Sequence, residues 1–372
     1  MSNMLDSISD VLLMGPGPSM VNDAVYKAMG TRLVGHMDFE FIELMNAVKE
    51  QLRTLCNTAN EVTMPMSGTG SAGMETCCVN LIEPGDQVLI LHNGVFSGRM
   101  MDVASRLGAE VDVLEFAWGT PVLPGKVKEK LTAKSYSIVG VIHAETSTGV
   151  CNPVEEIGEL VKKNGALYLV DSVTGLGGIE VALDKWGVDA FYSGTQKCLS
   201  CPPGLSPVSF SEKALEKLRA RKKKVPNWYL DMTLITQYWQ GQNRVYHHTA
   251  PISMNYALYQ ALALILEEGP TAVFARHRAM HEMLVAGLEK MGFSMFVEKS
   301  YRLPMLNLVV CPDGVDEAAL RKNLRVKHKI ELGGGLGPLA GKVLRIGVMG
   351  ETAREKYVQR LLDALKEETG RG

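Results

Sequence analysis

Lys197 and Asp171 follow apolar, strand-like runs, and their side chains could do chemistry together. Lys197 comes after residues 188–192 and a few small polar residues, and Asp171 ends the run 166–170. In an α/β protein, groups at the carboxyl ends of strands face the ligand crevice. A lysine amine there can form a Schiff base with an aldehyde cofactor of the pyridoxal phosphate type, and a carboxylate can keep the pyridine nitrogen of that cofactor protonated. A lone lysine after a strand is usually a solvated cation, so this interpretation depends on the neighbours of Lys197.

A glycine-rich turn offers a place for a phosphate. Residues 67–73 read Ser-Gly-Thr-Gly-Ser-Ala-Gly and precede a helical pattern that starts at Met74. Small residues let the backbone approach a phosphate, and a helix N-terminus supplies free N–H donors. The turn is not a P-loop, because no Gly-Lys-Ser/Thr follows at the required spacing. Taken alone, such a turn is as often only a connection between a strand and a helix.

Two more segments at expected strand exits carry side chains that could contact a ring. Phe96 could stack on a pyridine ring or could equally be a core aromatic, and residues 145–149, Glu-Thr-Ser-Thr-Gly, offer hydroxyls near a ring oxygen. Four such features in one order are much harder to assign to chance than any single one.

The elements that must position these residues alternate between strand and helix from about residue 60 to 210. Near-continuous apolar strands between helices predict a mostly parallel sheet that is covered on both faces. Apolar residues recur with a helical period in 39–55 and again in 74–82. The expected strands are 87–92, 111–116, 137–143, 166–170, 188–192 and 207–210, and the helices between them include 98–107 and 154–163.

The pattern changes after about residue 250 and predicts a smaller α+β unit that begins near Gly269. Three parts are expected: an N-terminal arm (1–14), a large cofactor-binding domain (15–268) and a small C-terminal domain (269–372). In the last part we expect helices at 271–291, 316–328 and 351–368 and strands at 293–297, 306–310 and 344–348, preceded by a helix at 252–268.

Composition and charge exclude several classes of function. The 372 residues carry a net charge of −2, which indicates no nucleic-acid partner. The basic run 219–224 ends a helical pattern, where cations are favoured. No apolar stretch approaches the roughly 20 residues of a membrane span, and the N-terminus lacks a secretory signal pattern. We therefore expect a protein without a membrane or nucleic-acid partner.

The seven cysteines lack the spacing of a disulfide framework, which fits a reducing cytoplasm. Cys198 and Cys201 match C-x-x-C, a pattern of redox pairs and half zinc sites. No second C-x-x-C and no H-x-x-H accompanies them, so we expect no metal site. Whether this pair has a role stays open.

Together these motifs make the chain resemble the class V, fold-type I pyridoxal phosphate-dependent aminotransferases, and within them the alanine–glyoxylate / serine–pyruvate aminotransferase group. The resemblance covers nearly the whole length. It implies an α/β fold with a large, mostly parallel-sheet domain and a smaller C-terminal α+β domain. The matching segments are 15–19 (Gly-Pro-Gly-Pro-Ser), 67–70, 145–149, 171–173, 193–197, 202–204, 246–249 (Tyr-His-His-Thr), 333–337 and 341–347.

The resemblance also implies a role for each site residue. Lys197 would form the Schiff base and move a proton at the reacting carbon, and Asp171 would pair with the pyridine nitrogen. Phe96 would stack on the ring, where relatives often have tryptophan, and Thr146 would lie near the ring oxygen. Gly70, Ser71 (histidine in some relatives) and Gln196 would hold the phosphate, and Thr69 would also bind the cofactor. In the neighbouring subunit's site, Tyr246 and Thr249 would reach the phosphate. The protein would then be a homodimer with active sites at the subunit interface.

Arg345, on an apolar strand of the C-terminal part, is the candidate for binding the substrate carboxylate. A guanidinium matches a carboxylate with two hydrogen bonds, and an arginine in that setting would be costly without a partner. A structural salt bridge is the alternative. Because no second anion site is evident, we expect alanine or serine as the donor and glyoxylate or pyruvate as the acceptor, in a ping-pong exchange.

Other activities on the same scaffold remain alternatives. They are serine–glyoxylate, ureidoglycine–glyoxylate and aminoethylphosphonate transamination, and a cysteine desulfurase-like lyase. Desulfurases usually have histidine before the lysine and over the ring, where Gln196 and Phe96 stand here, and a mobile cysteine, whereas Cys311 ends an expected strand. A non-enzymatic scaffold is disfavoured because Lys197 and Asp171 are both present. The physiological substrate pair, the pathway and any assembly beyond the dimer are not determined by the sequence.

Overall fold

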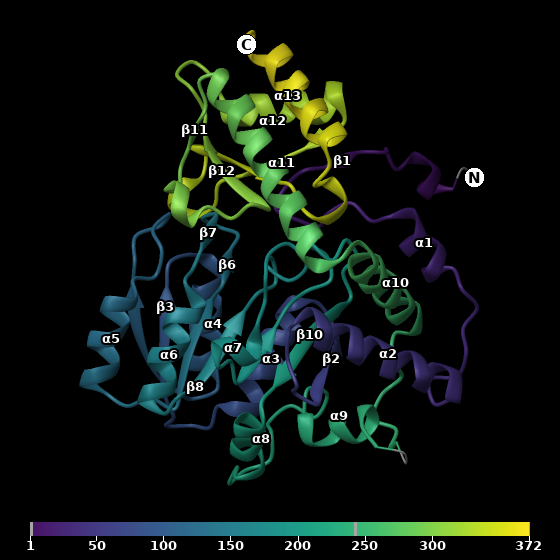
Figure 1. The fold of residues 1–372 in the computed structure, drawn as a ribbon, viewed down its shortest axis with the longest axis vertical. Helices are drawn as coiled ribbons and strands as arrows, with labels where there is room; N and C mark the ends of the chain where they lie inside the picture. The colour runs from purple at the N-terminus through teal and green to yellow at the C-terminus, as the bar shows by residue number, and fades with distance from the viewer. Residues whose placement is uncertain (1–2, 242–243, 372) are drawn as a thin grey trace.

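The computed structural model describes residues 3–241 and 244–371, and most of the chain before residue 269 surrounds a seven-stranded sheet (Figure 1). Strand β10 is antiparallel to both of its neighbours, and the remaining neighbours are parallel. The prediction of a mostly parallel sheet is confirmed. In spatial order the strands are β2 (Val62–Ser67), β10 (Leu205–Phe210), β9 (Ala190–Tyr192), β8 (Leu167–Asp171), β5 (Ile138–Ile142), β3 (Gln87–His92) and β4 (Glu110–Glu115).

Both faces of the sheet are buried, because alternate residues of one strand belong to two different cores. Leu89 and Leu91 of β3 pack in one buried cluster, and Val88 and Ile90 pack in the other. This is the burial expected for a parallel strand with helices on both sides. The first core contains residues of α5 (Pro124–Ala133), α6 (Val154–Asn164), α10 (Ile252–Glu268) and the end of α2 (Phe39–Leu55); the second contains residues of α3 (Gly70–Leu81), α4 (Val95–Arg106), α8 (Glu212–Arg219) and α9 (Met232–Trp239).

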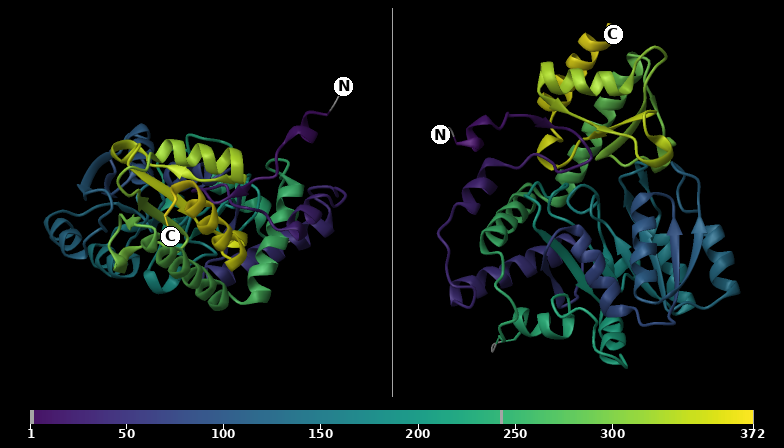
Figure 2. Two further views of the ribbon diagram at one scale, coloured as in Figure 1. Left: turned by 90° about the horizontal axis from the view of Figure 1, so that it is seen from above. Right: turned by 180° about the vertical axis from the view of Figure 1, so that it is seen from behind.

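The C-terminal part folds around a separate four-stranded antiparallel sheet, at the top of Figure 1. The start of the chain joins it, because β1 (Leu12–Leu13) pairs in parallel with β13 (Ile330–Glu331). Figure 2 shows the N-terminal segment crossing this unit before it reaches α1 (Asp23–Met29). The elements are β11 (Ser294–Met295), β12 (Leu306–Val310), β15 (Val343–Gly347) and β14 (Gly333–Gly334), with helices α11 (Pro270–Lys290), α12 (Glu317–Asn323) and α13 (Glu355–Thr369).

We propose Gly269 as the boundary between the two units. It connects α10 to α11 with a φ of 86°, a value that favours glycine. The segment 1–14, proposed as an arm, includes β1, and Leu12 and Met14 are buried in the C-terminal core. None of the helices in residues 3–241 and 244–371 is long and apolar enough to cross a membrane.

Three elements of the structure differ from the prediction. The expected helix at 316–328 is divided into α12 and a π-helical turn, Leu324–His328, and the expected helix at 351–368 starts only at Glu355. Strand β2 was not predicted. It contains Pro65, which cannot donate a backbone hydrogen bond and is tolerated because β2 lies at the sheet edge.

The sequence suggested that the basic run 219–224 forms the C-terminal end of a helix, but most of this run lies beyond the helix. Helix α8 already ends at Arg219. The next arginine, Arg221, turns back, and its Nη1 donates to the carbonyl oxygens of Asn80 and Ile82 at 3.0 and 2.9 Å. These carbonyls lie at the C-terminal end of α3, so Arg221 satisfies acceptors that a helix end leaves free.

Candidate active site

One pocket lies where β5, β8 and β9 end and α3 begins, and most of the predicted site residues line it. Chain segments far apart in sequence meet here because the parallel strands all end at the same edge of the sheet. Eight of the eleven predicted residues line it: Thr69, Gly70, Ser71, Phe96, Thr146, Asp171, Gln196 and Lys197. The other lining residues are Met74, Arg99, Ile142, Ala144, Val173, Thr174 and Tyr192.

Asp171 is the last residue of β8 and is buried. Its Oδ1 accepts a hydrogen bond from the Val173 N–H at 2.8 Å, and Tyr192 lies directly opposite it on β9. Burial raises the pKa of Asp171 to about 7, although the Tyr192 hydroxyl and the Val173 N–H oppose the rise. No cation within the described ranges forms an ion pair with this carboxyl group. The carboxylate is therefore set to pair with a cation that enters the pocket.

Lys197 is buried under the segment that carries Pro16 and Gly17. Its Nζ donates to the Pro16 carbonyl oxygen, and a Cβ placed on Gly17 would lie only 2.5 Å from Nζ. Ser19 fixes this arrangement, because its N–H and hydroxyl donate to the carbonyl oxygens of Gln196 and Lys197 at 2.9 and 2.6 Å. Burial, together with the charge of Arg345, lowers the pKa of Lys197 to about 8. A larger fraction of the amine is then unprotonated and nucleophilic near neutral pH.

The first turn of α3 leaves backbone donors free at the pocket. Thr69 precedes the helix, and the N–H groups of Gly70 and Ser71 donate to no acceptor in the described part of the chain. A Cβ on Gly70 would meet a Val173 methyl group at 3.1 Å, so glycine keeps this approach open. The buried Oε1 of Gln196 also lacks a partner among the described residues. The free N–H groups can bind an anion at the helix N-terminus, whereas the Gln196 Oε1 can only accept a hydrogen bond from a donor.

Buried Glu145 ties the start of α4, and with it Phe96, to the segment that carries Thr146. Its Oε1 accepts from the Ser147 hydroxyl and N–H at 2.6 and 3.1 Å, and its Oε2 lies 3.4 Å from the Ser97 nitrogen. Burial raises the pKa of Glu145, and these donors oppose the rise. These hydrogen bonds connect the start of α4, which carries Phe96, to the segment after β5, which carries Thr146.

Arg345 lies on β15 of the C-terminal sheet and reaches toward the pocket without lining it. Its Nε donates to the Gly334 carbonyl oxygen at 2.7 Å, and its Nη1 lies 3.5 Å from the Thr146 carbonyl oxygen. Within residues 3–241 and 244–371 it forms no ion pair, so the alternative of a structural salt bridge has no partner there. Burial lowers the pKa of its guanidinium. The Nη2 group makes no hydrogen bond to a described residue and can still bind an anion.

Tyr246 and Thr249 do not line the pocket of their own chain. Both side chains are exposed, and the ring of Tyr246 contacts only the ring of His36, at a centroid distance of 5.1 Å, among the described aromatic pairs. In a single chain these two residues therefore do not line the pocket with the other predicted phosphate-binding residues.

Four contributors to the site were not predicted from sequence: Tyr192, Arg99, Gly17 and Glu145. Tyr192 ends an expected strand, so the rule that identified Asp171 could have found it. Arg99 follows Phe96 by one helical turn, which places both on one face of α4. The contacts of Gly17 and Glu145 join distant segments, and no local pattern predicts them.

Cys198 and Cys201 are buried, and burial raises the pKa of each thiol to about 12. The Cys198 Sγ donates to the Thr174 carbonyl oxygen at 3.2 Å. A thiol reacts or binds metal as the thiolate, so this environment does not support redox or metal chemistry.

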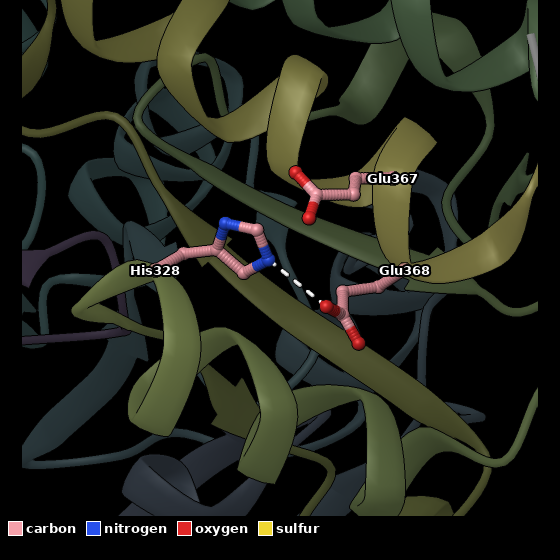
Figure 3. Close-up of side chains that lie close together, drawn as sticks. All are labelled: His328, Glu367 and Glu368. Carbon is pink, nitrogen blue, oxygen red and sulfur yellow. Dashed lines mark hydrogen bonds and ion pairs between the residues drawn. The ribbon is translucent and has the colours of Figure 1, made fainter.

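One cluster outside the pocket has the geometry of metal ligands, namely His328, Glu367 and Glu368 (Figure 3). His328 Nε2 lies 3.0 Å from a Glu368 carboxylate oxygen, and Lys327 Nζ contacts both oxygens of that carboxylate at 3.0 Å. The carboxylate is already paired with these groups. We interpret the cluster as an ion-pair network that joins the π-helical turn to α13.

Comparison with known proteins identifies the family. The Aminotransferase class-V family model matches residues 22–349. The chain is 40% identical to the alanine–glyoxylate aminotransferase of Drosophila melanogaster over 359 residues, covering 95% of this chain and 91% of that protein. It is 37% identical to the (S)-ureidoglycine–glyoxylate transaminase of Bacillus subtilis (strain 168), covering 95% and 89%.

A solved structure shows the same agreement in three dimensions. The alanine–glyoxylate aminotransferase from Nostoc sp. superposes with a TM-score of 0.95 at 47% identity, and the match covers 97% of this chain and 96% of the other. The resemblance inferred from the motifs and the predicted fold-type I architecture are both confirmed. The chain therefore belongs to the class-V aminotransferase family and is an aminotransferase whose cofactor is pyridoxal 5′-phosphate.

Proposed function

We propose that this enzyme moves an amino group from alanine or serine to glyoxylate or pyruvate by a ping-pong exchange. One observation carries the proposal: the guanidinium of Arg345 pairs with no described carboxylate, lies on the C-terminal sheet beside the pocket, and lowers the pKa of Lys197 by its charge. One such group can hold one carboxylate, which suits substrates without a second acid. The names of the relatives from Drosophila melanogaster and Nostoc sp. support alanine and glyoxylate.

The hydrogen-bonding groups that the pocket leaves free match the groups of the cofactor. The free N–H groups of Gly70 and Ser71 suit a phosphate, to which Gln196 could donate only through its amide N–H, and the buried Asp171 suits a protonated ring nitrogen. When bound, the cofactor supplies an electron-withdrawing ring that stabilises negative charge at the Cα of the substrate. We propose that Thr69 joins the phosphate-binding set and that Phe96 and Thr146 contact the ring.

We propose that the remaining residues act on the substrate in the following way. Arg345 binds the carboxylate of the amino acid and orients its Cα toward Lys197. The Nζ of Lys197, whose pKa is lowered to about 8, can accept a proton from Cα near neutral pH. Asp171 keeps the ring nitrogen protonated, because a buried carboxylate is stabilised by an adjacent cation. An amino acid leaves as its 2-oxo acid, and a second 2-oxo acid then uses the same site.

We propose that the active unit is a homodimer in which Tyr246 and Thr249 reach the phosphate in the site of the partner subunit. Tyr246 is 56% exposed, and Trp228, 62% exposed, stacks on His247 at 4.3 Å. Exposed apolar side chains that gather in this way are typical of protein interfaces. Tyr229 is also exposed, and its ring lies 6.4 Å from that of His247. Sedimentation of the purified protein tests the dimer, and a monomer at working concentration would contradict it.

We also propose a cytoplasmic location. All seven cysteines are free thiols, and five of them are buried. Free thiols persist in a reducing compartment, which supports this location.

A donor screen in single half-reactions tests the substrate proposal. The loaded enzyme is mixed with alanine, serine, glycine, aspartate, ureidoglycine or aminoethylphosphonate, and the change in the visible absorbance of the cofactor is followed. We expect alanine or serine to react fastest. Faster reaction with aspartate or the phosphonate would contradict a site for small substrates, faster reaction with ureidoglycine would favour that activity, and sulfide release from cysteine would indicate a lyase.

A further inference from the structure

Arg99 is the second basic residue that lines the cofactor pocket, and none of the predicted roles uses it. It lies on α4, one turn after Phe96, and its guanidinium carbon is 5.0 Å from the centroid of the Phe96 ring. Its Nη1 lies 3.5 Å from the Ser71 hydroxyl oxygen, at the N-terminus of α3. The Arg99 side chain therefore contacts both Phe96 and Ser71. We call the part of the pocket around Gly70 and Ser71, at the N-terminus of α3, the phosphate end.

The charge of Arg99 is not neutralised by the surrounding protein. No carboxylate in the described ranges pairs with it, whereas Arg106 on the same helix pairs with Asp102 at 2.8 Å. Stacking on an aromatic ring holds a guanidinium in place without satisfying its hydrogen-bond donors. The donors of Arg99 are thus available to an anion that occupies the pocket.

Apart from Arg99, the described residues that line the phosphate end of the pocket offer only neutral groups. Backbone N–H groups of the first helical turn, hydroxyl groups and the Gln196 amide are all uncharged. Lys197, the other basic residue among those lining the pocket, is buried with its amine against the Pro16 carbonyl group. A phosphate carries about −1.5 to −2 charges near neutral pH and binds most strongly to donors that are themselves charged.

We propose that Arg99 is a ligand of the cofactor's phosphate and supplies a full positive charge in addition to the partial charge of the helix N-terminus. The inference rests on the assigned cofactor and adds a binding residue to its site. Arg99 recognises the phosphate and not the ring, so its contribution depends on the phosphate group alone.

This dependence gives a direct test with the cofactor-free enzyme. Pyridoxal 5′-phosphate and pyridoxal, which lacks the phosphate, are titrated into the wild type and into Arg99→Gln, and binding is followed by quenching of tryptophan fluorescence. Loss of one charge-assisted interaction should weaken pyridoxal 5′-phosphate binding by roughly 10- to 100-fold. Pyridoxal binding should change less than about twofold, within the variation of near-neutral surface substitutions.

Two matched variants test whether the charge of Arg99 and its position beside the phosphate both matter. Arg99→Lys, which keeps the charge, should recover part of the lost affinity, and Arg106→Gln on the same helix should leave both affinities unchanged. Inorganic phosphate, as a competitor, should bind the wild type more tightly than Arg99→Gln. Circular dichroism of each cofactor-free variant verifies that the fold is intact.

Three results would overturn the inference or its basis. Equal losses for pyridoxal 5′-phosphate and pyridoxal would mean that Arg99 acts by supporting Phe96. Unchanged affinity for both would leave Arg99 as a solvated cation. Failure of the wild type itself to bind pyridoxal 5′-phosphate would instead refute the cofactor site.

Discussion

In the cofactor-free protein, Asp171→Asn should stabilise the fold at neutral and alkaline pH, although it removes a group that we place in the active site. Asparagine can keep the hydrogen bond from the Val173 N–H, and it never ionises. Burial raises the pKa of Asp171 from 3.8 to about 7. One pH unit of difference in pKa corresponds to about 1.4 kcal/mol, so ionisation of this carboxyl group costs the folded state about 4 kcal/mol.

The sign of the pH dependence follows from the direction of the pKa change. Because the folded-state pKa of Asp171 is the higher one, the folded protein binds more protons than the unfolded chain between about pH 4 and 7. The wild type should lose stability relative to Asp171→Asn across that window, and the difference should stay constant above it. Lys197 is present in both proteins, so its own titration largely cancels in the difference.

Urea unfolding of both cofactor-free proteins, followed by tryptophan fluorescence between pH 4.5 and 8.5, measures this effect. Protein concentration and salt are held constant, because association and screening also change apparent stability. A stability difference that is independent of pH would refute the reasoning, since it would mean that Asp171 titrates normally. Bound cofactor should reverse the order, because its ring nitrogen supplies the cation that the buried carboxylate lacks.

Three further perturbations test other parts of the site. Borohydride reduction should fix the cofactor to the wild type but not to Lys197→Ala, as mass spectrometry can verify; labelling of the variant would place the linkage elsewhere. Arg345→Gln should raise the KM for the donor by roughly 100-fold with cofactor affinity unchanged, and equal losses would indicate a structural role. Gly17→Ala should lower the free energy of unfolding in urea by about 1–3 kcal/mol, because Gly17 has a φ of 110° that favours glycine. It should also slow cofactor binding, because the new Cβ would lie 2.5 Å from Lys197 Nζ. Gly125→Ala, which has no atom within 4 Å of the new Cβ, is its control, and equal effects would contradict the steric argument.

Elements with strong local patterns could be predicted from the sequence. Helices α2 and α10 and strands β3 and β12 have the predicted bounds, because apolar periodicity and the residues that end each element are local properties. Edge strand β2 could not be predicted in this way. Its proline breaks the usual strand pattern, and its place at the edge depends on pairing with β10, more than 130 residues later in the chain.

The same division applies to the site. The sequence by itself determined that Lys197 and Asp171 would share a crevice, because each follows an apolar strand and parallel strands end at one edge of a sheet. Only the tertiary structure brought Pro16 over Lys197, placed Arg345 beside the Thr146 carbonyl group and left Arg99 unpaired at the phosphate end. It also decided the altered pKa values of Asp171 and Lys197. Those properties come from burial and from contacts between distant segments, and both arise only when the whole chain has folded.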